Sequence, residues 1–276
     1  MNERFSSTRP LLLRLFAASL GLAACGDENH ETLAEGEPSF KAGTVRIDNR
    51  TGYHGAMSNF WGLYSTPRVA EEIIGPCRLT DAGDAEEASR GPGSTYSAGP
   101  IVVEGAAVPI ALGEPVDGVA VVTLQSAPYV GGEMLTVRAA GGEVPAFEGT
   151  LRAPTAVQLS EPKPQADGAF AMTPTADQTF RWSGGTAGTA VVIAFESNDA
   201  GSPGLDATCT FDAAAGAGVV PGAVLAKLAA LDKAVALSLS VVGESEVPAG
   251  DFKVTLTART ALAPSRGPRA GVATFE

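Results

Sequence analysis

Histidine and cysteine are scarce in this chain, and their scarcity excludes several kinds of catalytic and metal site. The sequence holds two histidines and three cysteines in 276 residues, and His30 and His54 do not combine with the cysteines into a zinc-type ligand spacing. Serine catalysis needs a histidine base, and we interpret His54 as a strand-end residue rather than a member of a triad. P-loop, dinucleotide-binding and haem motifs do not occur. We therefore expect no catalytic residue, no metal and no cofactor.

The chain is also poor in basic residues, with 19 lysines and arginines against 31 acidic residues. Removing the first 24 residues takes away three arginines and one glutamate, which leaves 252 residues with 16 basic and 30 acidic side chains. Such a surface repels nucleic acid and anionic lipid headgroups. We therefore expect no nucleic-acid partner.

Long apolar runs are missing, and the longest near the N-terminus has ten residues, Leu15 to Ala24. A helix needs about 20 apolar residues to span a bilayer. The run follows Arg4, Arg9 and Arg14 and ends in small residues, which is the arrangement of a secretory signal peptide. The sequence predicts export.

Cys25 directly follows Leu22-Ala23-Ala24, and this segment resembles the lipobox of bacterial lipoproteins. The resemblance implies that Cys25 receives a thioether-linked diacylglycerol, with acyl chains such as palmitate, and becomes the new N-terminus. Each buried CH₂ contributes about 0.8 kcal/mol, so several chains would attach the protein to the membrane permanently. The alternative is an ordinary cleaved signal peptide with an incidental cysteine. Because Gly26 follows the cysteine, the resemblance favours the outer membrane.

Glycine and proline are plentiful, 33 and 19 residues, and they separate short apolar runs. This pattern predicts many short strands, the clearest at 101–104, 119–124, 134–139, 191–195, 235–241 and 252–256. Val224, Leu225, Leu228 and Leu231 form one apolar stripe behind Pro221 and predict a short helix. A further short helix is expected from Thr66 to Ile74. The fold class is therefore all-β, with two β-sandwich-like domains and a short helix in the C-terminal one.

Four segments follow from the composition. We expect a lipoprotein signal peptide at 1–24, a lipidated, flexible acidic tether at 25–41, an N-terminal β-sandwich-like domain at 42–160 and a C-terminal one at 161–276. The second boundary rests on the segment 161–168, which holds two prolines and a glycine and no apolar run.

Cys77 and Cys209 remain once Cys25 is assigned to lipid attachment. Export to an oxidising compartment makes a disulfide the default for such a pair. The two residues are 132 positions apart, and closing a loop of that length removes about 5 kcal/mol of unfolded-state entropy. The alternative is two buried, unpaired thiols.

Aromatic residues make up 6% of the chain, and four of them gather within twelve positions: Tyr53, Phe60, Trp61 and Tyr64. One interpretation is a stacking platform for a sugar or a peptide, which makes these four the candidate partner-binding residues. The alternative is one strand of an aromatic core. Exposure of the side chains distinguishes the two.

The second half of the chain resembles a family of lipoproteins found in myxobacteria and their relatives. The motifs are Phe180-Arg-Trp-Ser-Gly-Gly185, Cys209-Thr-Phe-Asp212 and Val247-Pro-Ala-Gly-Asp-Phe252, and Ser97-Ala-Gly-Pro-Ile-Val-Val103 is similar in the first half. The resemblance implies no catalytic residues. The C-terminal half also resembles an immunoglobulin or fibronectin type III sandwich with a buried tryptophan, Trp182.

These observations favour a lipid-anchored cell-envelope protein that is a non-catalytic binding or structural module. Its partners would be the membrane, through the anchor, and an envelope protein or glycan. The alternative is an envelope glycoside hydrolase or another carboxylate-dependent hydrolase, because thirty acidic residues supply many carboxylate pairs. The acidic segment 81–99 does not match the spacing of a calcium loop, and we interpret it as a solvated surface loop.

Overall fold

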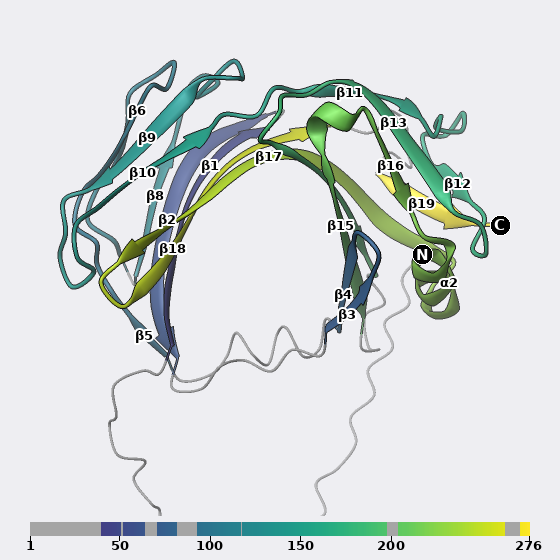
Figure 1. Ribbon diagram of the computed structural model, residues 1–276, viewed down its shortest axis with the longest axis horizontal. Helices are drawn as coiled ribbons and strands as arrows, with labels where there is room; N and C mark the ends of the chain where they lie inside the picture. Colours follow the sequence, from purple (N-terminus) through teal and green to yellow (C-terminus); the bar gives the residue numbers. More distant parts are fainter. Residues whose placement is uncertain are drawn as a thin grey trace, which may run out of the picture. The chain divides into compact units, whose positions relative to one another are not determined.

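Three β-sheets and one α-helix make up the part of the chain that the computed structural model describes (Figure 1). This part comprises residues 40–50, 52–63, 71–81, 93–116, 118–197, 204–262 and 271–276. The predicted signal peptide, Cys25, Tyr64 and residues 25–39 of the predicted tether lie outside the described residues. The last two residues of the predicted tether, Phe40 and Lys41, are instead the first residues of a β-strand, because they pair with the two neighbouring strands. The predicted all-β, sandwich-like fold is confirmed.

The largest sheet has twelve strands. Its main path runs through nine of them in the order β3 (Glu71–Ile74), β4 (Cys77–Asp81), β15 (Leu205–Asp212), β14 (Ala190–Glu196), β17 (Ala234–Ala249), β18 (Phe252–Leu262), β1 (Phe40–Arg50), β2 (Tyr53–Leu63) and β5 (Gly93–Thr95). Three strands join beside this path: β8 (Val119–Thr123) pairs with β2, and β19 (Val272–Phe275) pairs with β12 (Phe170–Met172) and β17. Most neighbours are antiparallel, but β1 is parallel to β18 and β12 is parallel to β19.

Two smaller sheets pack on the same face of the large one, over different strands (Figure 1). The four-stranded sheet consists of β10 (Phe147–Arg152), β9 (Met134–Ala139), β6 (Ile101–Glu104) and β7 (Ile110–Leu112). The three-stranded sheet consists of β11 (Val157–Glu161), β13 (Gln178–Gly184) and β16 (Ala217–Val220). A 3₁₀ turn, Ala213–Ala215, precedes β16.

Each smaller sheet encloses a hydrophobic core against the large sheet. In the first core, Val45, Ile47 and Leu256 of the large sheet meet Leu135 and Val137 of β9. In the second, Val191 and Ile193 of β14 meet Phe180 and Trp182 of β13. Alternation along each strand places these side chains on one face, so the opposite face of the large sheet carries the intervening, mostly polar residues.

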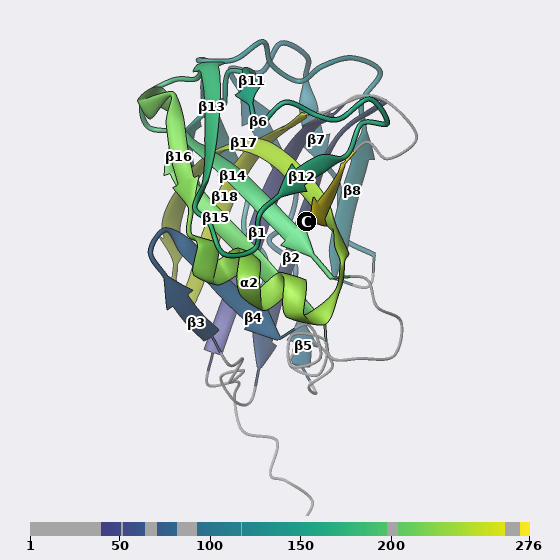
Figure 2. The same ribbon diagram turned by 90° about the vertical axis from the view of Figure 1, so that its right-hand side faces the viewer.

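The helix α2 (Gly222–Leu231) completes the second core (Figure 2). Val224, Leu225 and Leu228 are buried in it, whereas Leu231, at the end of the expected stripe, is half exposed. The predicted helix is confirmed, and it begins after Pro221 as expected.

Strands from both sides of residue 161, the predicted domain boundary, are hydrogen-bonded within the large sheet. The β3–β4 hairpin precedes this boundary but pairs with β15, and β1 pairs with β18. β17 contributes Val235 to the second core, and its far end contributes Ala249 to the first. All described residues fall within one compact unit, 37–276. The division into two domains stays a prediction. Strands from the two predicted domains pair with each other in the large sheet.

The helix expected from Thr66 to Ile74 is wrong at its C-terminal end. Ile73 and Ile74 belong to β3, and the chain turns at Gly75 and Pro76 into β4. Gly75 has a φ of 58°, a conformation that glycine adopts at little cost. Residues 64–70 lie outside the described part. Residues 71–74 therefore form a strand and not the end of the expected helix, because the tight turn lets them pair with β4.

Candidate functional site

Three of the four aromatic residues proposed for partner binding are described in the structure, and they do not lie together on one surface. Phe60 is 2% exposed, and its ring centroid lies 6.0 Å from that of Phe147 in the first core. Phe60 lies opposite Gly43 across β1 and β2, and a Cβ atom on Gly43 would lie 2.1 Å from its Cδ1 atom. Phe60 is therefore a core residue and not a partner-binding one, because strand alternation turns it inward.

Tyr53 and Trp61 lie on the other face of β2, opposite the core. Trp61 is half-buried, and Tyr53 is 37% exposed. The Tyr53 side chain lies over Gly55, since its hydroxyl oxygen would be 2.6 Å from a Cβ atom there. Its ring centroid is 5.4 Å from Cζ of Arg50, a cation–π contact. Tyr53, one of the four predicted residues, thus lies beside a cluster of polar side chains on β1.

Asp48 is the centre of this cluster. It lies opposite Gly55 in the antiparallel β1–β2 pair and opposite Arg259 in the parallel β1–β18 pair. Arg46 and Arg50 precede and follow it by two positions, so all three β1 side chains point to the same face. We call Arg46, Asp48, Arg50, Tyr53 and Arg259 the Asp48 cluster.

A buried carboxylate holds two of the three arginines. Asp48 is 2% exposed, and its Oδ2 atom accepts hydrogen bonds from Nε of Arg46 at 2.9 Å and from Nη2 of Arg50 at 3.2 Å. Charges are kept in such an environment only when they are paired. Oδ1 of Asp48, Nε of Arg50 and Nε of Arg259 are buried without a hydrogen-bond partner.

Positive charge is in excess within the Asp48 cluster. The pKa of Arg259 is lowered, chiefly because burial removes water from the guanidinium group and further because Arg50 and Arg46 repel it, while Asp48 and Glu196 act in the opposite direction. On β9 the ratio of charges is reversed, because one arginine, Arg138, is ion-paired with two carboxylates, Glu104 and Glu148. Three guanidinium groups around one carboxylate are unusual in a chain with a formal net charge of −12.

A pair of carboxylates lies elsewhere on the same face. Asp206 of β15 is directly opposite Glu196 of β14. Burial, and to a smaller extent the charge of Glu196, raise the pKa of Asp206. Directly opposite residues have Cβ atoms about 5 Å apart, and this spacing is compatible with the two-carboxylate arrangement of a glycoside hydrolase.

Among the pockets lined by described residues, two open on this face, and neither of these two is lined by Asp206 or Glu196. One, of about 540 Å³, is lined by the β3–β4 hairpin and by Thr208 and Thr210 of β15. The other, of about 380 Å³, is lined by residues 188–190, Val192, Thr210, Val242 and Glu244. Each holds one acidic side chain, Glu71 and Glu244 respectively, and Glu71 is ion-paired with Arg78 at 3.3 Å. Asp206, whose pKa is raised, therefore does not line either of these two pockets.

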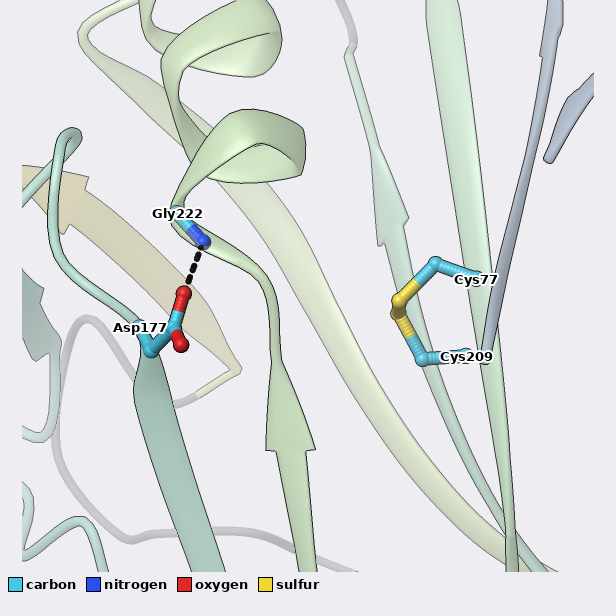
Figure 3. The surroundings of a disulfide bond; sticks show 4 residues. All are labelled: Cys77, Asp177, Cys209 and Gly222. Carbon is cyan, nitrogen blue, oxygen red and sulfur yellow. Dashed lines mark hydrogen bonds between the residues drawn. A yellow bond between two sulfur atoms is a disulfide. The ribbon is translucent and has the colours of Figure 1, made fainter. Parts of the chain in front are cut away.

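Cys77 and Cys209 form a disulfide within the second core, as expected for an exported chain (Figure 3). Within the described ranges, no group of three or more histidine, cysteine, aspartate or glutamate residues could hold a metal ion. Ser97 and His54 do not meet: the Ser97 hydroxyl donates to Glu114 and accepts from the amide of Gly99. No helix of the described residues is long and apolar enough to cross a bilayer.

The sequence shows the three β1 residues of the Asp48 cluster, but it does not show that Arg259 lies beside them. Arg46 and Asp48 alternate with Val45 and Ile47, a pattern that is typical of a half-buried strand with a polar outer face. The pattern Arg-x-Asp-x-Arg at 46–50 was therefore visible. Arg259 is 211 positions from Asp48, and only the parallel pairing of β1 with β18 brings it into the cluster.

Comparisons with known proteins show no family for this chain, since no family model and no curated protein matches it. Among solved structures, trypsin-activated alpha-2-macroglobulin from Escherichia coli is similar with 14% identity and a TM-score of 0.19, over 83% of this chain and 16% of its own. The Ca²⁺-stabilized adhesin that helps an Antarctic bacterium bind ice is similar with 14% identity and a TM-score of 0.19, over 87% of this chain and 50% of its own. The chain thus spans less than two thirds of either protein. At these TM-scores neither carries an argument about this chain.

Proposed function

We propose that this chain is a lipid-anchored protein of the cell envelope, at the outer membrane or the periplasmic face, and that its β-sheet body is a non-catalytic binding or structural module. The anchor is Cys25, and the acidic segment between it and the start of β1 at Phe40 is the tether. The lipobox resemblance supports the anchor, and the similarity to myxobacterial lipoproteins supports the same placement. The disulfide between Cys77 and Cys209 is in keeping with an oxidising compartment.

The Asp48 cluster is the observation that carries the binding part of this proposal. Two of its arginines, Arg46 and Arg50, are held in place by a buried carboxylate, and the partly exposed ring of Tyr53 lies beside Arg50. Pre-positioned charged groups next to an exposed aromatic ring are characteristic of recognition surfaces, since little side-chain freedom is lost on binding. An envelope glycan or protein is the class of partner that this surface would meet.

The anchor is tested by replacing Cys25 with serine. Wild-type protein should sediment with membranes, resist extraction by high salt and carbonate, and be released by detergent. Cys25→Ser should lack the acyl mass and keep the signal peptide, because lipoprotein processing requires the acylated cysteine. Mass spectrometry of the native N-terminus provides the direct measurement. An unmodified Cys25 in the mature wild-type chain would contradict the anchor.

Asp206 and Glu196 support a second candidate, a carboxylate-dependent envelope hydrolase. The raised pKa of Asp206 is what a general acid requires. Incubation of the purified full-length protein with envelope glycans should then release reducing ends, and Asp206→Asn should abolish the release. Hydrolysis that persists in Asp206→Asn would exclude this pair as its source.

A further inference from the structure

We propose that Arg46, Arg50 and Arg259 form a binding site for a phosphate group on the face of the large sheet opposite the cores. This inference rests on the proposed function of the body as a binding module and names the class of ligand. The ligand is either inorganic phosphate or a phosphate monoester on a sugar or a lipid headgroup.

The strand register places three guanidinium groups on three sides of one carboxylate. Arg46 and Arg50 are two residues before and after Asp48 on β1, which corresponds to about 7 Å along the strand in each direction. Arg259 is its neighbour on β18, about 5 Å away across the sheet. On the fourth side Gly55 of β2 has no side chain, and Tyr53 lies over it. The three cations therefore surround a small area of sheet.

The hydrogen bonds of the Asp48 cluster leave most guanidinium donors unused. A guanidinium group has five N–H donors, yet Arg46 and Arg50 each place one hydrogen bond on the same oxygen of Asp48. Nε of Arg259 is buried without a hydrogen-bond partner, and its guanidinium group forms no ion pair with any described residue. The side chains of Arg46 and Arg50 are 38% and 40% exposed. A ligand can therefore reach their outer nitrogen atoms from solvent.

The charges favour a phosphate group over a single carboxylate. Three guanidinium groups and Asp48 carry a formal excess of two positive charges, of which the charge of Glu196, acting on Arg259, compensates a part. Like charges held side by side are unfavourable until an anion compensates them. A phosphate monoester carries up to two negative charges and three terminal oxygen atoms, whereas a carboxylate carries one charge and two oxygen atoms. Arginine binds phosphate in a bidentate manner. Phosphate thus matches both the charge and the number of donors.

Tyr53 gives the site one apolar side. Its partly exposed ring lies against Arg50 and over Gly55. A sugar ring attached to the phosphate would stack on it, whereas inorganic phosphate would not need it.

The test is isothermal titration of the full-length protein in detergent with inorganic phosphate, at constant ionic strength set with chloride. Arg259→Gln and Arg50→Gln should each weaken binding at least tenfold. Arg181→Gln is the matched control, because Arg181 is exposed on β13 and paired with Glu161, and it should bind as wild type does. Unfolding midpoints without phosphate establish that each variant is folded. Two folded variants with unchanged affinity, or a wild type that binds none of the phosphate ligands, would overturn the proposal.

The source of the phosphate is distinguished with two soluble monoesters. Glucose 6-phosphate binding more tightly than inorganic phosphate, and losing this advantage in Tyr53→Ala, would identify a phosphorylated sugar. Glycerol 3-phosphate binding most tightly would identify a lipid headgroup, and inorganic phosphate binding most tightly would identify the ion itself. None of these titrations depends on the anchor, so an unmodified Cys25 with intact phosphate binding would contradict only the proposed anchoring.

Discussion

Cys77 and Cys209 lie directly opposite each other in the β4–β15 pair although 132 positions separate them in the sequence. Their Cα atoms are 3.9 Å apart, and both side chains are buried in the second core. The disulfide attaches the β3–β4 hairpin, which comes from the first half of the chain, to a strand from the second half. It joins parts of the sheet that the chain itself connects only through long segments.

Removal of this disulfide should destabilise the protein strongly. The chain-entropy model gives about 5 kcal/mol for a loop of this length, so the double variant Cys77→Ser, Cys209→Ser should unfold at a much lower urea concentration. The measurement is urea denaturation followed by tryptophan fluorescence. A reducing agent should shift wild type toward the double variant and leave the variant itself unchanged; equal midpoints for all three samples would contradict a stabilising role.

Asp177 caps the helix from another segment. The N-cap position is Pro221, which offers no side-chain acceptor, and Oδ1 of Asp177 accepts a hydrogen bond from the Gly222 amide at 2.8 Å (Figure 3). Asp177→Ala leaves this amide without its partner and should cost about 1 kcal/mol. Asp177→Asn keeps an oxygen acceptor and should cost clearly less. The comparison is made by urea denaturation, and equal losses for the two variants would show that the hydrogen bond is not the cause.

Gly43 makes room for the Phe60 ring. Because a Cβ atom at Gly43 would lie 2.1 Å from Phe60 Cδ1, Gly43→Ala must displace a buried aromatic ring and should cost about 1–3 kcal/mol. Gly113→Ala is the matched control, since a Cβ atom there would meet no other atom within 4 Å. Thermal unfolding should show a lower midpoint for Gly43→Ala than for Gly113→Ala. Similar midpoints would mean that the core adjusts without cost.

Asp206 should make stability depend on pH. Its pKa is raised by burial and by Glu196, so the folded state binds the proton more tightly than the unfolded state does. The stability from this group is complete at low pH and is lost as the pH rises through the raised pKa. Asp206→Asn should therefore gain stability relative to wild type as the pH rises above about 4, the ordinary pKa of aspartate. Urea denaturation at a series of pH values measures this, and parallel curves for the two proteins would contradict it.

Most of the strands could be predicted from the sequence, but their order in the sheet could not. Val235 to Val241 and Phe252 to Leu256 alternate with polar residues, and both segments are strands with those side chains turned inward. Local alternation contains no information on which strand lies beside which. The parallel β1–β18 pair and the pairing of β4 with β15 depend on contacts between residues more than 100 positions apart.

The candidate site likewise has a part that the sequence predicts and a part that it does not. Tyr53 was identified because aromatic residues cluster near it, but Phe60 in the same cluster belongs to the core. The face to which each side chain points follows from the period of two along β2, and the neighbouring strands decide which face is covered. Arg259 carried no local signal, because a single arginine within an alternating strand is typical of a solvated face.

The amino-acid sequence by itself determined that the chain folds into strands with one short helix behind Pro221, because alternation, apolar stripes and turn residues are local properties of the chain. It also made Cys77 and Cys209 the pair available for a disulfide. Only the tertiary structure decided that the hairpin holding Cys77 joins the far sheet edge and that Arg259 comes to lie beside Asp48. Burial of two cores against one shared sheet selects these pairings, and that selection depends on the whole chain at once.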